Sequence, residues 1–220
     1  MPTPQTLVII DPATRTAEVE CYEEIAHRAA PLSSSYHLPA LEGMSSLQGL
    51  ERTDAIIILG SGASVYDDLP WQRPLNEWVY ERMEAGVPTL GICYGHQMLA
   101  HIYGAPVDLL WDGHKEKGVR QVKLHSERLG LRDQEGPLTV SHREGVTQCP
   151  SKFRVFATSP ACSIDGIEHR ILPIWGVQPH VEAVDGFVRN NEIRVTDPEA
   201  TFAYGYRFID AFLNFVLSNG

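Results

Sequence analysis

Short apolar runs alternate along the first half of the chain with segments in which apolar residues recur every three or four positions. Residues 7–10, 55–59 and 87–92 are continuous or nearly continuous apolar runs of the kind that form strands buried on both faces. Between them, residues 18–30 have a helical periodicity that ends at a proline. A second helical segment ends at Gly86, and a third runs to Gly104.

The pattern changes beyond Pro106, where short strand-like segments are separated by turn residues. A final helix with apolar positions on one face is predicted over residues 202–217. Strands that alternate with helices predict a parallel sheet, and the later strands add a mixed portion. We therefore predict one α/β domain over residues 1–220, with a central, mostly parallel sheet flanked by helices. The expected later strands are residues 119–124, 138–141, 154–158, 163–168 and 172–178.

Composition narrows the possible partners. The 220 residues carry a formal net charge of −10, which argues against nucleic acid or an anionic membrane surface as a partner. No apolar stretch is long enough to span a membrane, and residues 1–5 lack the pattern of a signal peptide. Four widely spaced cysteines form no Cys-x-x-Cys pair, so we expect neither a zinc ribbon nor a disulfide framework. A cytoplasmic location fits these features.

The most informative segment is Gly91-Ile92-Cys93-Tyr94-Gly95, which joins a predicted strand to a predicted helix. A cysteine between two glycines at such a junction is typical of a nucleophile held in a sharp turn. The helix N-terminus beneath the sulfur also favours a thiolate. This pattern predicts covalent catalysis by Cys93.

A nucleophilic cysteine needs a base, a group that orients the base, and donors for an oxyanion. His180 and Glu182 follow the last predicted strand, and residues two apart in an extended segment point to the same side. We expect His180 to be the base and Glu182 to orient it. The expected oxyanion donors are the backbone N–H of Tyr94 and the loop Gly60-Ser61-Gly62.

These features resemble the class I, or triad-type, glutamine amidotransferases. That family carries Gly-x-Cys-x-Gly-His-Gln at the nucleophile, His-x-Glu near the C-terminus and a glycine-rich oxyanion loop, all present here in that order. The resemblance runs from about residue 53 to residue 182. Within the family it is strongest to the glutaminase domain of GMP synthase. It implies the family's flavodoxin-like fold.

The resemblance also implies an activity. Glutamine would be hydrolysed at its side-chain amide through a γ-glutamyl thioester on Cys93, and the ammonia would pass to a synthase domain or subunit, such as a GMP-synthase-like partner. Gln97 and the backbone near Ser141 and His142 would hold the main-chain groups of L-glutamine. Neither a metal nor an organic cofactor is expected.

Departures from the family pattern leave the γ-glutamyl donor open. The oxyanion loop lacks the family's usual Gly-Gly-Pro, a change that backbone donors tolerate. Arg143 and Glu144 stand where GMP synthase has Gly-Asp, and Arg143 either obstructs glutamine or binds a carboxylate.

Three functional interpretations therefore remain, since the sequence also contains no Gly-x-x-x-x-Gly-Lys-[Ser/Thr] loop. The first is an amidotransferase that works with a separate synthase. The second is a free-standing γ-glutamyl hydrolase acting on a peptide or amine conjugate. The third is a non-catalytic binding or regulatory homologue.

Overall fold

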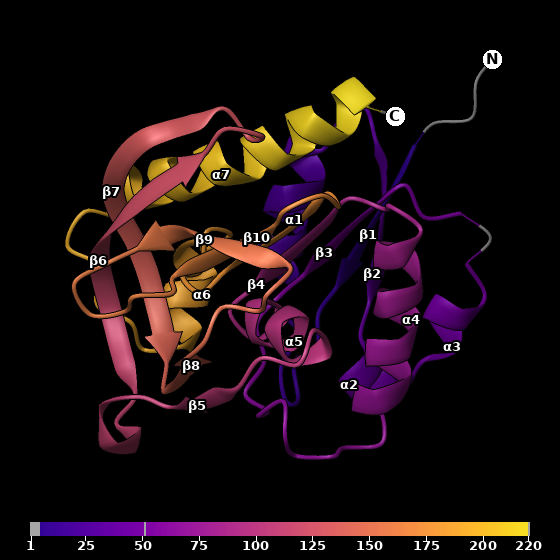
Figure 1. Ribbon diagram of the computed structural model, residues 1–220, viewed down its shortest axis with the longest axis horizontal. Coiled ribbons are helices and arrows are strands. Elements are labelled where there is room, and N and C mark those ends of the chain that lie inside the picture. Colours follow the sequence, from indigo (N-terminus) through magenta and orange to yellow (C-terminus); the bar gives the residue numbers. More distant parts are fainter. Residues whose placement is uncertain (1–4, 51, 220) are drawn as a thin grey trace.

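In the computed structural model, which describes residues 5–50 and 52–219, strands from both halves of the chain join a nine-stranded sheet (Figure 1). Its order is β2-β1-β3-β4-β11-β10-β9-β6-β7. From one edge to the other the strands are β2 (Ser33–His37), β1 (Thr6–Ile10), β3 (Ala55–Ile58), β4 (Thr89–Ile92), β11 (Ile174–Val177), β10 (Gly166–His169), β9 (Phe153–Thr158), β6 (Glu116–Ser126) and β7 (Leu131–His142).

The five strands from β2 to β11 are parallel, and both faces of this half are covered by helices. In β1, Leu7 and Ile9 face one hydrophobic core, whereas Val8 and Ile10 face the other. Each of these side chains is fully buried, which explains why the strand reads as a continuous apolar run. The mixed α/β sheet expected from the sequence is confirmed.

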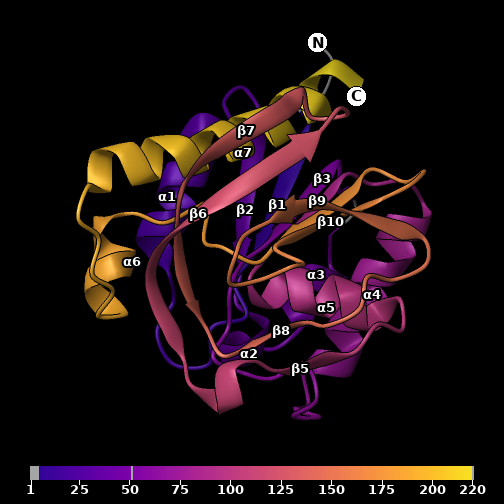
Figure 2. The same ribbon diagram turned by 60° about the vertical axis from the view of Figure 1, so that its left-hand side comes forward.

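Helices cover the two faces of the sheet in separate groups (Figures 1 and 2). One core contains residues of α1 (Val19–Arg28), α6 (Asp185–Asn190) and α7 (Pro198–Asn219). The other contains residues of α3 (Ser45–Gln48), α4 (Gln72–Glu84) and α5 (Tyr94–Ile102), with α2 (Pro39–Glu42) packed beside them. Both cores are apolar, so the sheet is the middle of three layers.

The antiparallel half differs most from expectation. Strands β6 and β7 are 11 and 12 residues long, so the predicted segments 119–124 and 138–141 capture only part of each. The start of β7 is rich in charged residues, and Gly136 and Pro137 follow them. This segment therefore lacks the alternation of apolar and polar residues by which a strand is recognised in a sequence. A Cβ atom at Gly136 would meet the ring of Tyr204, so the glycine lets α7 pack closely against this edge strand.

Several short elements were not expected from the sequence. Strand β2 begins with three serines and pairs only at the sheet edge, where no apolar face is required. Strands β5 (Val107–Leu109) and β8 (Glu144–Val146) form a separate pair, and a 3₁₀ turn, η1, spans Trp111–Gly113. In the described ranges no helix combines the length and apolarity needed to cross a bilayer. The expectation for a leader falls mainly on residues 1–4, which lie outside the described residues.

The parallel strands all end at the same edge of the sheet, which gathers their following loops in one place. The segments after β1, β3, β4 and β11 begin at Asp11, Leu59, Cys93 and Gln178. In open α/β sheets ligands bind at this carboxyl edge. The fold therefore brings together the sequence segments singled out above.

A test of this packing is Gly95, in the first turn of α5. A Cβ atom there would collide with the backbone oxygen of Ile58 in β3. We expect Gly95→Ala to lower the free energy of unfolding by roughly 1–3 kcal/mol, as overpacking does, in a urea titration. Gly49→Ala is the matched control, because a Cβ atom at Gly49 would be 3.6 Å from the nearest oxygen. Equal stability of the two variants would contradict the packing described here.

Candidate active site

Cys93 occupies a strained turn between β4 and α5. Its backbone has φ 52° and ψ −101°, outside the regions that side-chain-bearing residues favour. The turn is held because the Cys93 N–H donates to Val177 O at 2.9 Å and its carbonyl accepts from the Gln97 N–H at 3.1 Å. A Cβ atom at Gly91 would collide with the Gly95 backbone, so both glycines permit the close approach of strand and helix. The sharp strand-to-helix turn expected at Cys93 is present.

His180 reaches the same place from the end of β11. Its N–H donates to Thr139 O at 2.8 Å in an isolated bridge to β7. Its ring Nδ1 lies 2.8 Å from Oε1 of Glu182, and both side chains are buried. The two residues lie in a bridge and a following turn, so the expected continuous extended segment is wrong, although the expected pairing is present. The carboxylate accepts from Nδ1, so this nitrogen carries a proton and the ring is held in one orientation, while Nε2 takes no part in the contact.

The electrostatics favour a charged imidazole. Burial alone would lower the pKa of His180, but the carboxylate of Glu182 and the charge and hydrogen bond of Cys93 outweigh it and raise the pKa to about 10. A Cβ atom at Gly60 would lie 2.9 Å from Cε1 of His180 and 3.7 Å from Cβ of Cys93. Loops from three strands therefore converge on one point, and Gly60 leaves the space in which they meet.

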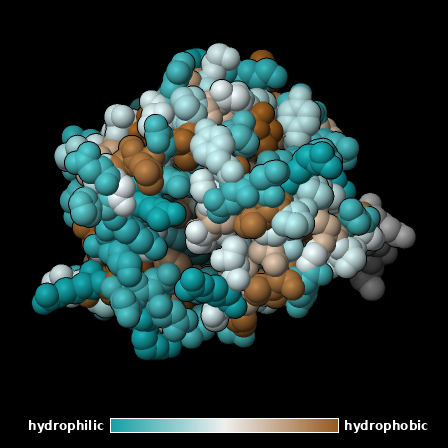
Figure 3. Space-filling model, turned by 90° about the horizontal axis from the view of Figure 1, so that it is seen from below, coloured by the Kyte–Doolittle hydropathy of each residue, from teal (hydrophilic) through white to brown (hydrophobic). Residues whose placement is uncertain are grey.

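A cleft of about 690 Å³ opens above these residues. Figure 3, viewed from below, faces this edge of the sheet, where hydrophilic side chains cover much of the surface. The predicted residues Cys93, His180, Glu182 and Ser141 line the cleft, as do all three of Gly60–Gly62. Its other lining residues are Ala13, Thr14, Arg15, Thr16, Glu18, Leu59, Lys115, Phe187, Asn190 and Asn191.

Hydrogen bonds of the Ser61 side chain anchor the Gly60–Gly62 loop. The Ser61 hydroxyl donates to Pro12 O at 2.7 Å and accepts from the Ala63 N–H at 3.1 Å. The three residues of the loop line the same cleft as Cys93. Tyr94 begins α5 directly after the nucleophile, and its side chain is buried away from the cleft.

Three predicted substrate-binding residues lie outside the lining of the cleft. The Gln97 amide donates to Glu144 O at 2.8 Å and to Gln178 Oε1 at 3.1 Å, which ties α5 to neighbouring segments. His142 donates from Nδ1 to Glu144 O at 2.8 Å and packs against Trp111. Burial, with the charge of Arg120, lowers the pKa of His142 to about 3, so this ring is neutral. The Arg143 side chain is exposed and lies beside Glu144.

Two cations of the cleft, Arg15 and Lys115, lie outside every motif of the sequence. Arg15 follows β1, and Lys115 precedes β6. Burial lowers the pKa of Lys115, and the nearby charge of Cys93 opposes that shift. The sequence positions of the two cations do not reveal that they lie in this cleft. The order of the strands in the sheet brings both residues into the same cleft as Cys93. Among the described residues no group of three or more His, Cys, Asp or Glu side chains is arranged to hold a metal ion.

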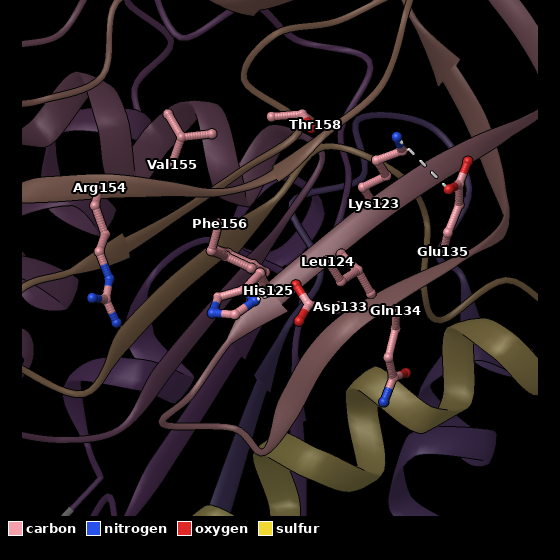
Figure 4. Close-up of a pocket in the computed structure, with 10 residues that line it drawn as sticks. All are labelled: Lys123, Leu124, His125, Asp133, Gln134, Glu135, Arg154, Val155, Phe156 and Thr158. Carbon is pink, nitrogen blue, oxygen red and sulfur yellow. Dashed lines mark hydrogen bonds and ion pairs between the residues drawn. The ribbon is translucent and has the colours of Figure 1, made fainter.

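A second hollow, of about 470 Å³, lies over β6, β7 and β9 (Figure 4). Its charged groups are already paired: Lys123 with Glu135, His125 with Asp133, and Arg154 with Glu168 outside the hollow. Its lining contains no nucleophile beside a base. The chemistry therefore belongs to the cleft at the strand ends.

Comparison with known proteins agrees with this geometry. The sequence pattern of the family described as Glutamine amidotransferase class-I matches residues 17–192, which is most of the chain. The protein therefore belongs to the class-I glutamine amidotransferase family.

Several similar proteins are GMP synthases. The GMP synthase [glutamine-hydrolyzing] of Ralstonia pickettii is 36% identical over 138 residues, and that of Burkholderia cenocepacia is 35% identical over 138 residues. Each match covers 58% of this chain but only 24% of the relative, so the chain spans about a quarter of the length of these relatives.

Solved structures confirm the fold over nearly the whole chain. A glutamine amidotransferase from Thermotoga maritima has a TM-score of 0.71 at 20% identity, and the match covers 98% of this chain and 97% of that one. A glutamine amidotransferase from Methylobacillus flagellatus has a TM-score of 0.73 at 19% identity, with 98% and 95% covered.

The charge on His180 provides a test of the site. Glu182→Gln removes the carboxylate that supports the imidazolium, so we expect the pKa of His180 to fall from about 10 toward or below about 6.5. An NMR titration of the His180 ring signals measures this value. The raised pKa stabilises the fold most below about pH 6.5, and this contribution is lost as the pH rises through about 10.

Glu18→Gln is the matched control for this titration. Glu18 also lines the cleft and interacts electrostatically with His180, but its side chain makes no hydrogen bond to the ring that the structure records. It should therefore shift the pKa of His180 less than Glu182→Gln does. Equal shifts in the two variants, or an unchanged pKa in Glu182→Gln, would contradict the assigned pairing.

Proposed function

We propose that this protein hydrolyses the side-chain amide of L-glutamine through a γ-glutamyl thioester on Cys93. The observation that supports this most is the convergence of Cys93, His180 and Gly60 at one end of the cleft. An intact arrangement of this kind favours turnover over a non-catalytic binding or regulatory role. Family membership supports glutamine as the donor.

Acylation starts from a thiolate and an imidazolium. The sulfur of Cys93 attacks the amide carbon, and a C–S bond forms while the carbonyl oxygen takes up negative charge. The backbone N–H groups of the 60–62 loop and of Tyr94 stabilise that oxyanion. His180 then donates its Nε2 proton to the amide nitrogen, the C–N bond breaks, and ammonia leaves.

Deacylation reverses the role of the histidine. Neutral His180 takes a proton from water, and the resulting hydroxide attacks the thioester carbon. The C–S bond breaks, glutamate leaves, and the thiolate and imidazolium are restored. Throughout, Glu182 holds the ring in one tautomer and balances the charge that Nε2 gains. No step requires a metal or an organic cofactor.

We further propose that the ammonia passes to a synthase, with a GMP-synthase-like partner as the first candidate. Support comes from relatives named GMP synthase [glutamine-hydrolyzing], of which this chain matches about a quarter. Gln97, Ser141 and His142 are proposed to shape the glutamine site, the first and third through the Glu144 carbonyl that both contact. A cytoplasmic location and a single domain over residues 1–220 stay predictions.

The direct test is Cys93→Ala. We expect ammonia release from glutamine to fall by at least about 10³-fold, since nucleophile removal leaves only residual rates. Cys149→Ala is the matched control, because that thiol lies outside the cleft and is half-buried. Ammonia release from glutamine should be measured with the isolated chain and again after adding cell extract as the source of a synthase. Activity retained in Cys93→Ala would refute the assignment.

A further inference from the structure

Two cations lie on opposite sides of the nucleophile. Along the sheet the order is β1, β3, β4 and β11, and the end of β7 joins through the bridge from His180 to Thr139. Arg15 belongs to the loop after β1, whereas Lys115 precedes β6, the neighbour of β7. Cys93, after β4, lies between them, and all three line the same cleft.

The two acidic residues of the cleft accept hydrogen bonds from groups other than its two cations. Glu182 accepts from His180, and Glu18 accepts from the Asn191 amide at 3.2 Å. Within residues 5–50 and 52–219, no carboxylate forms an ion pair with Arg15 or with Lys115. In a chain of net charge −10, the described part of this cleft therefore holds two cations without a carboxylate partner, Arg15 and Lys115. This is a pattern that favours anionic ligands.

The loop that carries Arg15 is fixed at both ends. Fully buried Asp11 accepts from the Ala13 N–H at 2.9 Å and from the Glu18 N–H at 2.7 Å. The Tyr36 hydroxyl donates to the same carboxylate at 2.5 Å. The Ser61 hydroxyl adds a link to Pro12 at 2.7 Å. The backbone of residues 11–18 is thus held against the oxyanion loop, so Arg15 starts from a defined position at the rim.

Free glutamine does not use both cations. It has one carboxylate, on the acyl side of the scissile amide, and its leaving group is ammonia. Lys115 lines the cleft and interacts electrostatically with Cys93, to which the acyl group becomes attached, so it is the cation assigned to the acyl side. Arg15 is then left without an anion. A cleft of about 690 Å³ also has the size that larger ligands occupy.

We propose that the site also cleaves γ-glutamyl conjugates whose leaving amine carries a carboxylate, and that Arg15 binds this carboxylate. The inference rests on the proposed Cys93 chemistry. The sulfur attacks the γ-glutamyl carbon, and the C–N bond breaks. The proton from His180 goes to the departing amine, which leaves as a free amino acid or peptide. Water then hydrolyses the thioester to glutamate. The guanidinium offers two parallel donors to a carboxylate, which fits this role.

The test compares two substrates that differ only in the charge of the leaving amine. These are γ-glutamylglycine and γ-glutamylglycinamide. The wild type should show a kcat/KM for the glycine conjugate that is roughly tenfold higher or more, as a charge-assisted hydrogen bond provides. Arg15→Ala should bring that ratio close to one. Arg15→Lys should retain part of it, because it keeps the charge and loses the paired donors.

Lys115→Ala is the matched comparison. It should lower kcat/KM for both conjugates by similar factors, because the glutamyl part is common to them. Calorimetric titration of Cys93→Ala with the two conjugates gives the same comparison without turnover, and adding Arg15→Ala should equalise the two dissociation constants. A ratio unchanged by Arg15→Ala, or one abolished by Lys115→Ala instead, would overturn the assignment.

The outcomes also separate this inference from the proposed function. A wild type that hydrolyses glutamine but shows no preference for the charged conjugate, or does not cleave it, overturns the role of Arg15 alone. A wild type that releases product from none of the three compounds, with or without extract, contradicts the Cys93 chemistry as well.

Discussion

The close approach of β4 and α5 is the constraint on which the site depends. Gly91 and Gly95 leave no room for side chains between the strand and the helix, and Cys93 between them takes a left-handed backbone conformation. Such a conformation persists only when its surroundings hold it in place. Here the Val177 carbonyl, the first turn of α5 and the strand beneath do so. The sulfur is therefore directed into the cleft before any substrate arrives.

The site also depends on the positive charge of the buried His180 ring, which would be unfavourable without Glu182 and Cys93. His180 is buried, and burial by itself would keep the ring neutral. Glu182, also buried, reverses this, and the sulfur of Cys93 adds to the effect. The three groups come from two strand ends and a turn, so the charge distribution of the site depends on the parallel half of the sheet. The antiparallel half contributes the bridge from Thr139, the wall at Ser141 and Lys115.

The sequence predicted those parts of the site whose chemistry depends on local spacing. Cys93 lies between two glycines, and His180 is two residues from Glu182, so both motifs can be recognised from the sequence alone. Strands β1, β3, β4 and β11 were found because burial on both faces makes them almost wholly apolar, whereas the serine-rich edge strand β2 was missed. Arg15 and Lys115 were missed, since only the order of strands places them beside Cys93. Arg143 was given weight because of its position in the motif, whereas its side chain lies exposed outside the cleft.

The central claim is that Cys93, and no other cysteine, is the activated nucleophile of a glutamine-shaped site. Reaction with a diazoketone analogue of glutamine, followed by peptide mapping in a mass spectrometer, tests this most directly. We expect one adduct, on Cys93, that excess glutamine suppresses, with Cys21, Cys149 and Cys162 unmodified. An unlabelled Cys93, or labelling spread over the other thiols and indifferent to glutamine, would contradict it.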